Sequence, residues 1–212
     1  ANLNVMVCSR ALLNVARRME TDYGIPYFEG SFYGAENTTR TLLTIARHFD
    51  SPELLARAEA LCESEFERHN AELQLYKACL KGKRALLYTG GVKSWSIVGA
   101  LQELGVEVVA TGAKKSTKED KARIHQLMGD DAWLITDGSP AKLIDVYEKT
   151  DADILLAGGR NQFTAIKARV PFVHVNQERE SQFAGYSGFV NLAREMCYAI
   201  QSPVFDQVKK PE

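Results

Sequence analysis

Apolar residues follow two alternating spacings along the chain. Short apolar runs typical of buried strands are separated by longer segments in which apolar residues recur at helical spacing. This alternation predicts a parallel sheet with helices on both faces. The expected strands lie at 3–7, 27–32, 84–89, 107–111, 133–136, 154–157 and 172–175. The expected helices lie at 11–23, 37–49, 53–79, 94–103, 118–128, 140–148, 162–168 and 188–200.

These elements group into four units, which together predict an α/β fold. Residues 83–177 contain the longest regular series and predict a Rossmann-like, doubly wound parallel sheet domain. Residues 1–50 are expected to form part of a second α/β domain, residues 51–82 a connecting helix, and residues 178–212 a C-terminal loop and helix. Because the chain enters a strand directly without an initiator Met, we expect it to be a piece of a longer or processed protein.

One helix start carries a specific local signal. Ser116 and Glu119 stand three residues apart at the beginning of the expected helix 118–128. This is the spacing of a capping box, in which each side chain satisfies a backbone N–H of the first helical turn. We therefore expect Ser116 to cap this helix.

Composition and charge narrow the class of protein. The 212 residues are 45% hydrophobic, and 26 Lys and Arg balance 27 Asp and Glu for a net charge of −1. A balanced charge gives no support to a nucleic-acid partner. No apolar run reaches the roughly 20 residues of a membrane helix, and no basic-then-apolar signal segment begins the chain. We expect a cytoplasmic protein that binds neither nucleic acid nor a membrane.

Among the four cysteines, Cys8 differs in its surroundings. Cys62, Cys79 and Cys197 lie in helical, partly apolar stretches and are expected to be small buried side chains. Cys8 follows an expected strand and precedes an expected helix, where the helix dipole and Arg10 favour the thiolate that binds metals or attacks substrates. A buried structural thiol is the alternative for Cys8.

Cations and glycines gather at the carboxyl ends of the expected strands, where open α/β sheets bind their ligands. Besides Cys8 and Arg10, the residues concerned are Gly90, Gly91, Lys93, Lys114, Lys115, the pair Gly158-Gly159, Arg160 and Asn176. Glycines allow a ligand to approach the backbone, and cations balance negative charge. This edge therefore suits a bulky anion, although each cation alone could be a solvated loop charge.

Two kinds of anion fit this edge. The run Gly90-Gly91-Val92-Lys93-Ser94 resembles a nucleotide-binding P-loop, but Val92 stands where that motif requires glycine, and no GxGxxG follows a strand. The other candidate is a metal cluster held by Cys8 between glycine and cationic walls.

The four histidines indicate no further chemistry. They do not cluster, and no Ser-His-Asp or HExxH pattern supports a hydrolase. His174 lies inside an expected strand beside Phe172 and Val173. We therefore expect His174 to be a structural side chain with its hydrogen bonds satisfied.

Several runs together resemble a known family. They are Asn2-Leu-Asn-Val-Met-Val-Cys8, Met19-Glu-Thr-Asp-Tyr-Gly-Ile-Pro-Tyr, Phe32-Tyr-Gly34, Tyr88-Thr-Gly-Gly-Val-Lys93-Ser-Trp, Thr111-Gly-Ala-Lys-Lys-Ser-Thr-Lys-Glu-Asp, Val175-Asn-Gln-Glu-Arg-Glu and Gly185-Tyr-Ser-Gly-Phe. Through nearly all of its length the chain resembles the α-type chains of the nitrogenase component 1 family. It resembles most the α-like scaffold subunits on which the iron–molybdenum or iron–vanadium cofactor is matured. Chains of that family are longer and carry an N-terminal domain with further cluster-ligating cysteines.

The resemblance implies roles for the residues of the edge. Cys8 stands where α-type chains anchor the cofactor through iron, and Arg10 stands where an arginine lines the site. Gly90 and Gly91 match a glycine pair against which the cluster packs, and Lys93 stands where nitrogenase usually has arginine.

The remaining positions bear on the organic acid and the heterometal. Arg160 stands near the position of a lysine that holds the organic acid, and Lys114 and Lys115 would help to offset negative charge. Asn176 replaces the histidine that binds molybdenum or vanadium in the catalytic chains. An amide is a poor ligand for such a metal, so this difference favours a scaffold over an enzyme.

The resemblance therefore implies an assembly scaffold that is not itself an enzyme. It would bind an iron–sulfur cluster precursor while molybdenum or vanadium and homocitrate are added. Its expected partners are a β-like scaffold subunit of the NifN or VnfN type, in a heterotetramer, and the nitrogenase iron protein. The alternatives are the α subunit of a nitrogenase-like reductase and a nucleotide-binding Rossmann module.

Overall fold

The structure is a computed structural model, and it describes residues 1–7, 11–89, 92–114, 116–176, 178 and 181–204. Its strands are β1 (Asn4–Met6), β2 (Tyr27–Glu29), β3 (Arg84–Tyr88), β4 (Glu107–Gly112), β5 (Trp133–Ile135), β6 (Ile154–Ala157) and β7 (Phe172–His174). Its α-helices are α1 (Leu13–Tyr23), α2 (Ala35–His48), α3 (Pro52–Leu80), α4 (Val92–Glu103), α5 (Lys118–Met128), α6 (Pro140–Lys149), α7 (Gln162–Ala168) and α8 (Gly185–Gln201). A short 3-10 turn, η1 (Gly159–Asn161), precedes α7.

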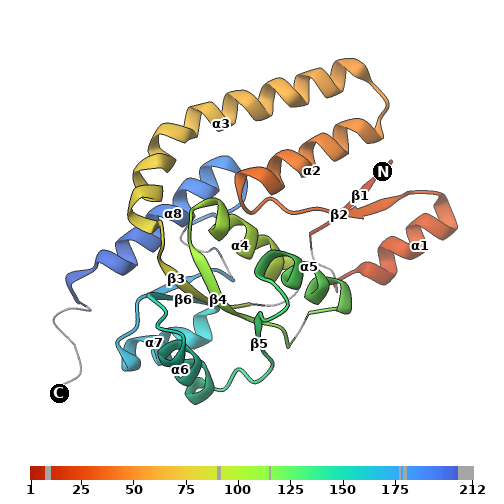
Figure 1. Ribbon diagram of the computed structural model, residues 1–212. Coiled ribbons are helices and arrows are strands. Elements are labelled where there is room, and N and C mark those ends of the chain that lie inside the picture. Colours follow the sequence, from red (N-terminus) through yellow and green to blue (C-terminus); the bar gives the residue numbers. More distant parts are fainter. Residues whose placement is uncertain (8–10, 90–91, 115, 177, 179–180, 205–212) are drawn as a thin grey trace, which may run out of the picture.

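A five-stranded parallel sheet forms the centre of the molecule, in the order β5-β4-β3-β6-β7. All four residues of β6 are buried, and so is the middle of β3. Such continuous apolar strands are typical of a parallel sheet covered on both faces. Leu87 and Leu156 face a core shared with α4 and α8, whereas Leu86 and Leu155 face α6 and α7. Figure 1 shows these helix pairs on opposite sides of the sheet. The predicted α/β, doubly wound fold is confirmed.

The N-terminal part has a small sheet of its own. Strands β1 and β2 pair in parallel, with Val5 opposite Phe28, and α1 connects them. Helix α2 then packs against α3, α4 and α8, which joins this part to the rest of the molecule (Figure 1). At the junction Phe32 accepts a backbone hydrogen bond from Gly185 at 2.8 Å, and Tyr33 forms an isolated bridge with Ala184.

Helix α3 spans 29 residues, close to the expected range. Ser51 caps its start, because the hydroxyl accepts a hydrogen bond from the N–H of Leu54 at 3.2 Å and Pro52 occupies the first turn. The buried Leu73 and Leu80 belong to the core cluster that also contains Met196 of α8. Figure 1 shows α3 passing along α2 and α8.

The expected capping box was displaced by one residue. Helix α5 begins at Lys118, so Thr117 is its N-cap and Asp120 is its third residue. Thr117 accepts from the N–H of Asp120 at 3.1 Å, and Asp120 accepts from the N–H of Thr117 at 2.8 Å. The prediction of Ser116 as the cap was therefore wrong, because two neighbouring hydroxyl residues and two neighbouring acidic residues allow either register.

Several other boundaries also differ from their predictions. Strand β2 ends at Glu29 rather than near residue 32, and Gly30 follows it. A Cβ on Gly30 would lie 2.8 Å from Thr41 Cγ2, so the chain passes too close to α2 for a larger residue there. Helix α8 begins at Gly185, ahead of the predicted residue 188.

The start of α2 is capped from another helix. Its N-cap, Gly34, has a φ of 84° and no side chain, and the carboxylate of Glu103 in α4 takes the place of a cap. Glu103 accepts from the N–H of Ala35 at 3.0 Å and of Glu36 at 3.3 Å. Burial raises the pKa of Glu103, and the two N–H donors oppose this rise without cancelling it. This contact ties the N-terminal part to α4.

We predict that Glu103→Ala lowers the free energy of unfolding by about 1–2 kcal/mol, because two N–H groups at the start of α2 lose their acceptor. Urea denaturation of the variant and the parent protein measures the difference. The control is Glu107→Ala, which removes an exposed carboxylate paired with Arg84 at 3.3 Å and should cost less than about 0.5 kcal/mol. Equal losses in the two variants would contradict this account of the cap.

Candidate site at the carboxyl edge of the five-stranded sheet

The strand order places a topological switch point between β3 and β6. From β3 the chain adds β4 and β5 on one side, and then returns to add β6 and β7 on the other side. The loops that follow β3 and β6 therefore diverge at a switch point, where open α/β sheets bind ligands. The loop after β6 consists of Gly158 and η1. This is the edge at which the cations and glycines were predicted to gather.

Of the nine residues to which the family resemblance gives a role, the structure describes four. Cys8, Arg10, Gly90, Gly91 and Lys115 lie outside the described residues. The other four are Lys93 in the first turn of α4, Lys114 after β4, Arg160 in η1 and Asn176 after β7. Lys93 is half-buried, and the other three are exposed. All four therefore stand at the carboxyl ends of strands, as expected from the sequence.

Asn176 packs directly against the loop after β6. A Cβ built on Gly158 would lie 2.6 Å from Asn176 Nδ2, which is closer than two such atoms can approach. Glycine at this position thus allows the amide of Asn176 to lie on the backbone of the β6 loop. The contact brings Asn176 beside the segment that carries Arg160.

His174 was predicted to have its hydrogen bonds satisfied, and this prediction was wrong. Its Nε2 is buried and has no hydrogen-bond partner among the described residues. The ring lies against Gly159, with 3.2 Å between Cε1 and a Cβ placed there. A buried nitrogen without a partner is costly, and such groups mark places where a ligand or water completes the site. The unpaired nitrogen lies next to the loop that carries Arg160.

Lys93 is held at the end of β7 by several acceptors. Its ammonium donates to the carbonyl oxygens of Val175 at 2.9 Å and Asn176 at 3.4 Å. It also forms an ion pair with Glu178 Oε1 at 2.6 Å and lies 4.9 Å from the centre of the Tyr33 ring. Both side chains of the ion pair are largely buried, with 26% of Lys93 and 18% of Glu178 exposed. The charge of Lys93 is therefore already balanced within the protein.

Glu178 connects three separate segments, and the sequence did not single it out. Besides Lys93, it accepts from the hydroxyl of Tyr33 and, through Oε2, from the N–H of Phe183 at 3.0 Å. Burial raises its pKa, but hydrogen bonds from Lys93, Tyr33 and Phe183 outweigh burial and leave the pKa of Glu178 below its ordinary value. Burial and the nearby carboxylate raise the pKa of Tyr33. Glu178 is thus ionised at neutral pH.

The ends of β3 and β4 are held close together beneath the edge. The hydroxyl of Ser94 donates to the carbonyl oxygen of Gly112 at 3.1 Å and lies 3.3 Å from the hydroxyl of Thr89. A Cβ on Gly112 would lie 2.4 Å from the carbonyl oxygen of Thr89, so only glycine fits there. These contacts fix the start of α4 relative to the sheet. They therefore also fix the backbone from which the Lys93 side chain extends.

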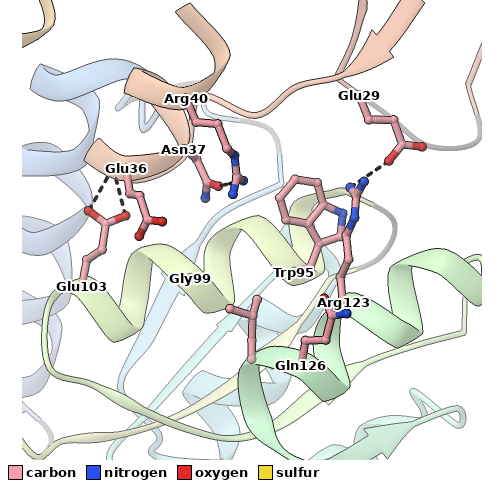
Figure 2. A pocket seen from close by; sticks show the side chains of 10 residues that line it. Glu29, Glu36, Asn37, Arg40, Trp95, Gly99, Glu103, Arg123 and Gln126 are labelled. Atoms are coloured by element: carbon pink, nitrogen blue, oxygen red, sulfur yellow. Dashed lines mark hydrogen bonds and ion pairs between the residues drawn. The ribbon is translucent and has the colours of Figure 1, made fainter. Parts of the chain in front are cut away.

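A separate cavity of about 270 Å³ lies between α2 and the helices α4 and α5 (Figure 2). Arg123 lies at one end of it, where its guanidinium stacks 4.7 Å above the Trp95 ring and pairs with Glu29 at 2.9 Å. Glu103 lies at the other end, bound to the start of α2. The cavity is therefore a polar junction between the N-terminal part and the main sheet, away from the carboxyl edge.

The described part of the chain shows neither of two other kinds of site. No group of three or more His, Cys, Asp and Glu side chains in it is arranged to hold a metal ion. None of its helices combines the length and apolar character needed to cross a bilayer.

Comparison with known proteins identifies the family. The model of the family described as nitrogenase component 1 type oxidoreductase matches residues 1–201. The chain belongs to this family. The doubly wound sheet and its carboxyl edge are therefore those of a nitrogenase component 1 chain.

Similar proteins within the nitrogenase component 1 family carry a more specific name. The chain is 53% identical over 211 residues to the "Nitrogenase iron-molybdenum cofactor biosynthesis protein NifE" of Nostoc sp., covering 100% of this chain and 44% of that protein. It is 52% identical over 207 residues to the protein of the same name from Klebsiella pneumoniae, covering 98% of this chain and 45% of that protein. The chain thus spans less than half the length of these curated relatives.

A solved structure agrees with the family assignment. "Nitrogenase Cp1 at pH 5" superposes on this nitrogenase component 1 chain with a TM-score of 0.83 and 27% identity. The match covers 100% of this chain and 49% of the solved chain. The fold therefore corresponds to about half of a nitrogenase component 1 polypeptide.

We predict that the ion pair of Lys93 and Glu178 weakens in acid. A carboxylate whose folded pKa is depressed stabilises the fold above its unfolded pKa, ordinarily 4.5, and this contribution disappears as the pH falls through the lower folded pKa. Glu178→Gln cannot titrate, so the difference in unfolding free energy between parent and variant should be largest near pH 7 and shrink below pH 4.5. Urea denaturation across this pH range measures it. A difference that stays constant with pH would contradict the prediction.

Proposed function

We propose that the chain forms part of an assembly scaffold for the nitrogenase iron–molybdenum cofactor or its iron–vanadium counterpart. The observation that carries the proposal is the 53% identity to a NifE protein across the whole chain. In this proposal an iron–sulfur cluster precursor is the cargo. The scaffold holds it while molybdenum or vanadium and homocitrate are added, and then passes it on without itself acting as an enzyme.

The carboxyl edge has features that suit such a cargo. Arg160 and Lys114 are exposed, and neither forms an ion pair within the described part of the chain, so both can face an anion. Gly158 and Gly159 place backbone at this edge, and His174 Nε2 lies beside them without a hydrogen-bond partner among the described residues. Cationic and polar groups around bridging sulfides stabilise an iron–sulfur cluster. In this proposal Cys8 supplies the thiolate and Arg10, Gly90, Gly91 and Lys115 complete the wall.

The amide of Asn176 is consistent with a scaffold that binds its metal cargo temporarily and then releases it. Its amide packs on the β6 loop at the position where the family resemblance implies a metal-binding histidine in catalytic chains. Amide oxygens are weak ligands for molybdenum and vanadium compared with imidazole. A chain with asparagine here would release its cargo more readily than one with histidine, as an assembly scaffold requires.

The proposal extends to compartment and partners. We infer that the chain works in the cytoplasm with a β-like scaffold subunit in a heterotetramer, and that the nitrogenase iron protein docks on that assembly. Its support is membership of the nitrogenase component 1 family. The relatives bear the name of a cofactor biosynthesis protein. They therefore favour neither alternative function, that of a reductase α subunit or that of a nucleotide-binding module.

We predict that Cys8→Ala abolishes cluster loading, because alanine offers no thiolate to iron. The protein is reconstituted anaerobically with iron and sulfide and assayed by absorption, paramagnetic resonance and bound iron. Cys79→Ala is the matched control, because it removes a partly buried thiol from α3 and should load normally. Full iron retention by Cys8→Ala would overturn the assignment of Cys8, and failure of the unaltered protein to load would overturn the proposed function.

We predict that Asn176→His holds the heterometal longer, because imidazole is the better ligand. Molybdenum retained after anaerobic desalting of the loaded protein measures this. Asn70→His, which adds an imidazole to α3 far from the edge, is the control and should retain as much metal as the unaltered protein. Equal retention by Asn176→His and the unaltered protein would argue against a site at this position.

A further inference from the structure

We propose that Glu178 is a positioning residue that holds Lys93 on the end of β7 and moderates the positive charge of the edge. The inference rests on the proposed function, because the charge matters for an anionic cargo. Of the four predicted site residues that the structure describes, Lys93 is the one with a carboxylate partner within the described part of the chain. The charge of Lys93 is therefore balanced by Glu178, unlike the charges of the exposed Lys114 and Arg160.

The contacts of Lys93 indicate a fixed position. A lysine side chain is long and flexible, and its ammonium makes up to three directed hydrogen bonds. Here those donors meet Val175 O, Asn176 O and Glu178 Oε1, at 2.9, 3.4 and 2.6 Å. Since two acceptors are the backbone of the segment that carries Asn176, the ammonium also holds that segment against the first turn of α4.

The charge of the pair has a direct consequence. An ammonium and a carboxylate at 2.6 Å form a neutral unit toward a distant anion, so Lys93 adds little attraction while Glu178 is ionised. Replacing Glu178 with glutamine preserves an acceptor and the size of the side chain but adds one positive charge at the edge. The protein should then hold an anionic cluster more tightly and release it more slowly. For a scaffold that must pass on its cargo, Glu178 favours release.

Glu178 also aligns the two parts of the proposed site. It accepts from the hydroxyl of Tyr33, four residues after the end of β2, and from the N–H of Phe183, which precedes α8. Tyr33 in turn bridges Ala184. One carboxylate therefore connects the carboxyl edge of the main sheet to the N-terminal part of the chain, to which Cys8 belongs.

The first test needs no cluster. Lysines of the cargo-free protein are modified briefly with an amine-reactive ester, and each peptide is quantified by mass spectrometry. The exposed Lys114 is the internal standard. Glu178→Ala should raise the labelling rate of Lys93 relative to Lys114 by about fivefold, as expected for loss of a partly buried ion pair. An unchanged rate would overturn the positioning role.

The second test follows the cargo. Loaded protein is exposed anaerobically to an iron chelator, and iron loss is timed by absorption and paramagnetic resonance. Glu178→Gln should lose iron about threefold more slowly than the unaltered protein, because of the added positive charge. The Lys93→Met/Glu178→Gln double variant has no charge at either position, like the neutral ion pair of the unaltered protein, and should therefore lose iron at the unaltered rate. A double variant that loses iron as slowly as Glu178→Gln alone would overturn a role exerted through the charge of Lys93.

A matched control removes general charge effects. Glu107 pairs with Arg84 at 3.3 Å at the opposite, amino edge of the same sheet, so Glu107→Gln makes the same change in net charge. It should leave iron loss unchanged, and an equal slowing would overturn a local role for Glu178.

If the unaltered protein loads no cluster, the proposed function fails. If it loads and Glu178→Gln releases iron at the unaltered rate, only the role of Glu178 fails.

Discussion

The ion pair between Lys93 and Glu178 is the interaction on which the geometry of the candidate site depends. It joins the first turn of α4 to the segment after β7, and Tyr33 brings the N-terminal part to the same carboxylate. Segments more than 140 residues apart along the chain therefore meet at one charged group, as the separation of 145 between Tyr33 and Glu178 shows. In a largely buried position such a pair is strong only when its other hydrogen bonds are also made, and here both carboxylate oxygens have partners.

A second set of contacts holds the same two parts together on the other side of α4. Glu103 caps α2 at one end of the cavity of Figure 2, and Arg123 links Trp95 to Glu29 at the other end. The N-terminal part is thus fastened to α4 and α5 by polar contacts on one side and to the β7 segment on the other. Because the proposed cluster thiol, Cys8, belongs to this N-terminal part, its placement relative to Arg160 and Asn176 depends on both sets of contacts.

The charge distribution at the edge fits the proposed role of binding an anionic cargo for a limited time. Two cations, Lys114 and Arg160, are exposed, whereas Lys93 is balanced by a carboxylate. In the proposed function Asn176 offers only an amide, which is a weak ligand for molybdenum or vanadium. His174 adds a buried nitrogen without a hydrogen-bond partner among the described residues, beside the glycines of the β6 loop. Together these features combine attraction for an anion with few permanent bonds to it.

The sequence by itself determined the α/β class, the order of strands and helices, and the strand ends at which Lys93, Lys114, Arg160 and Asn176 lie. These features follow from local hydrophobic spacing, which reports which residues are buried within each element. Local spacing left the cap of α5 open between Ser116 and Thr117, and the structure places it at Thr117. Only the tertiary structure decided that His174 Nε2 lacks a hydrogen-bond partner among the described residues and that Glu178 neutralises Lys93. The physical reason is that ion pairs and burial of single atoms depend on which strands become neighbours, and residues 85 apart in the chain carry no local sign that they will meet.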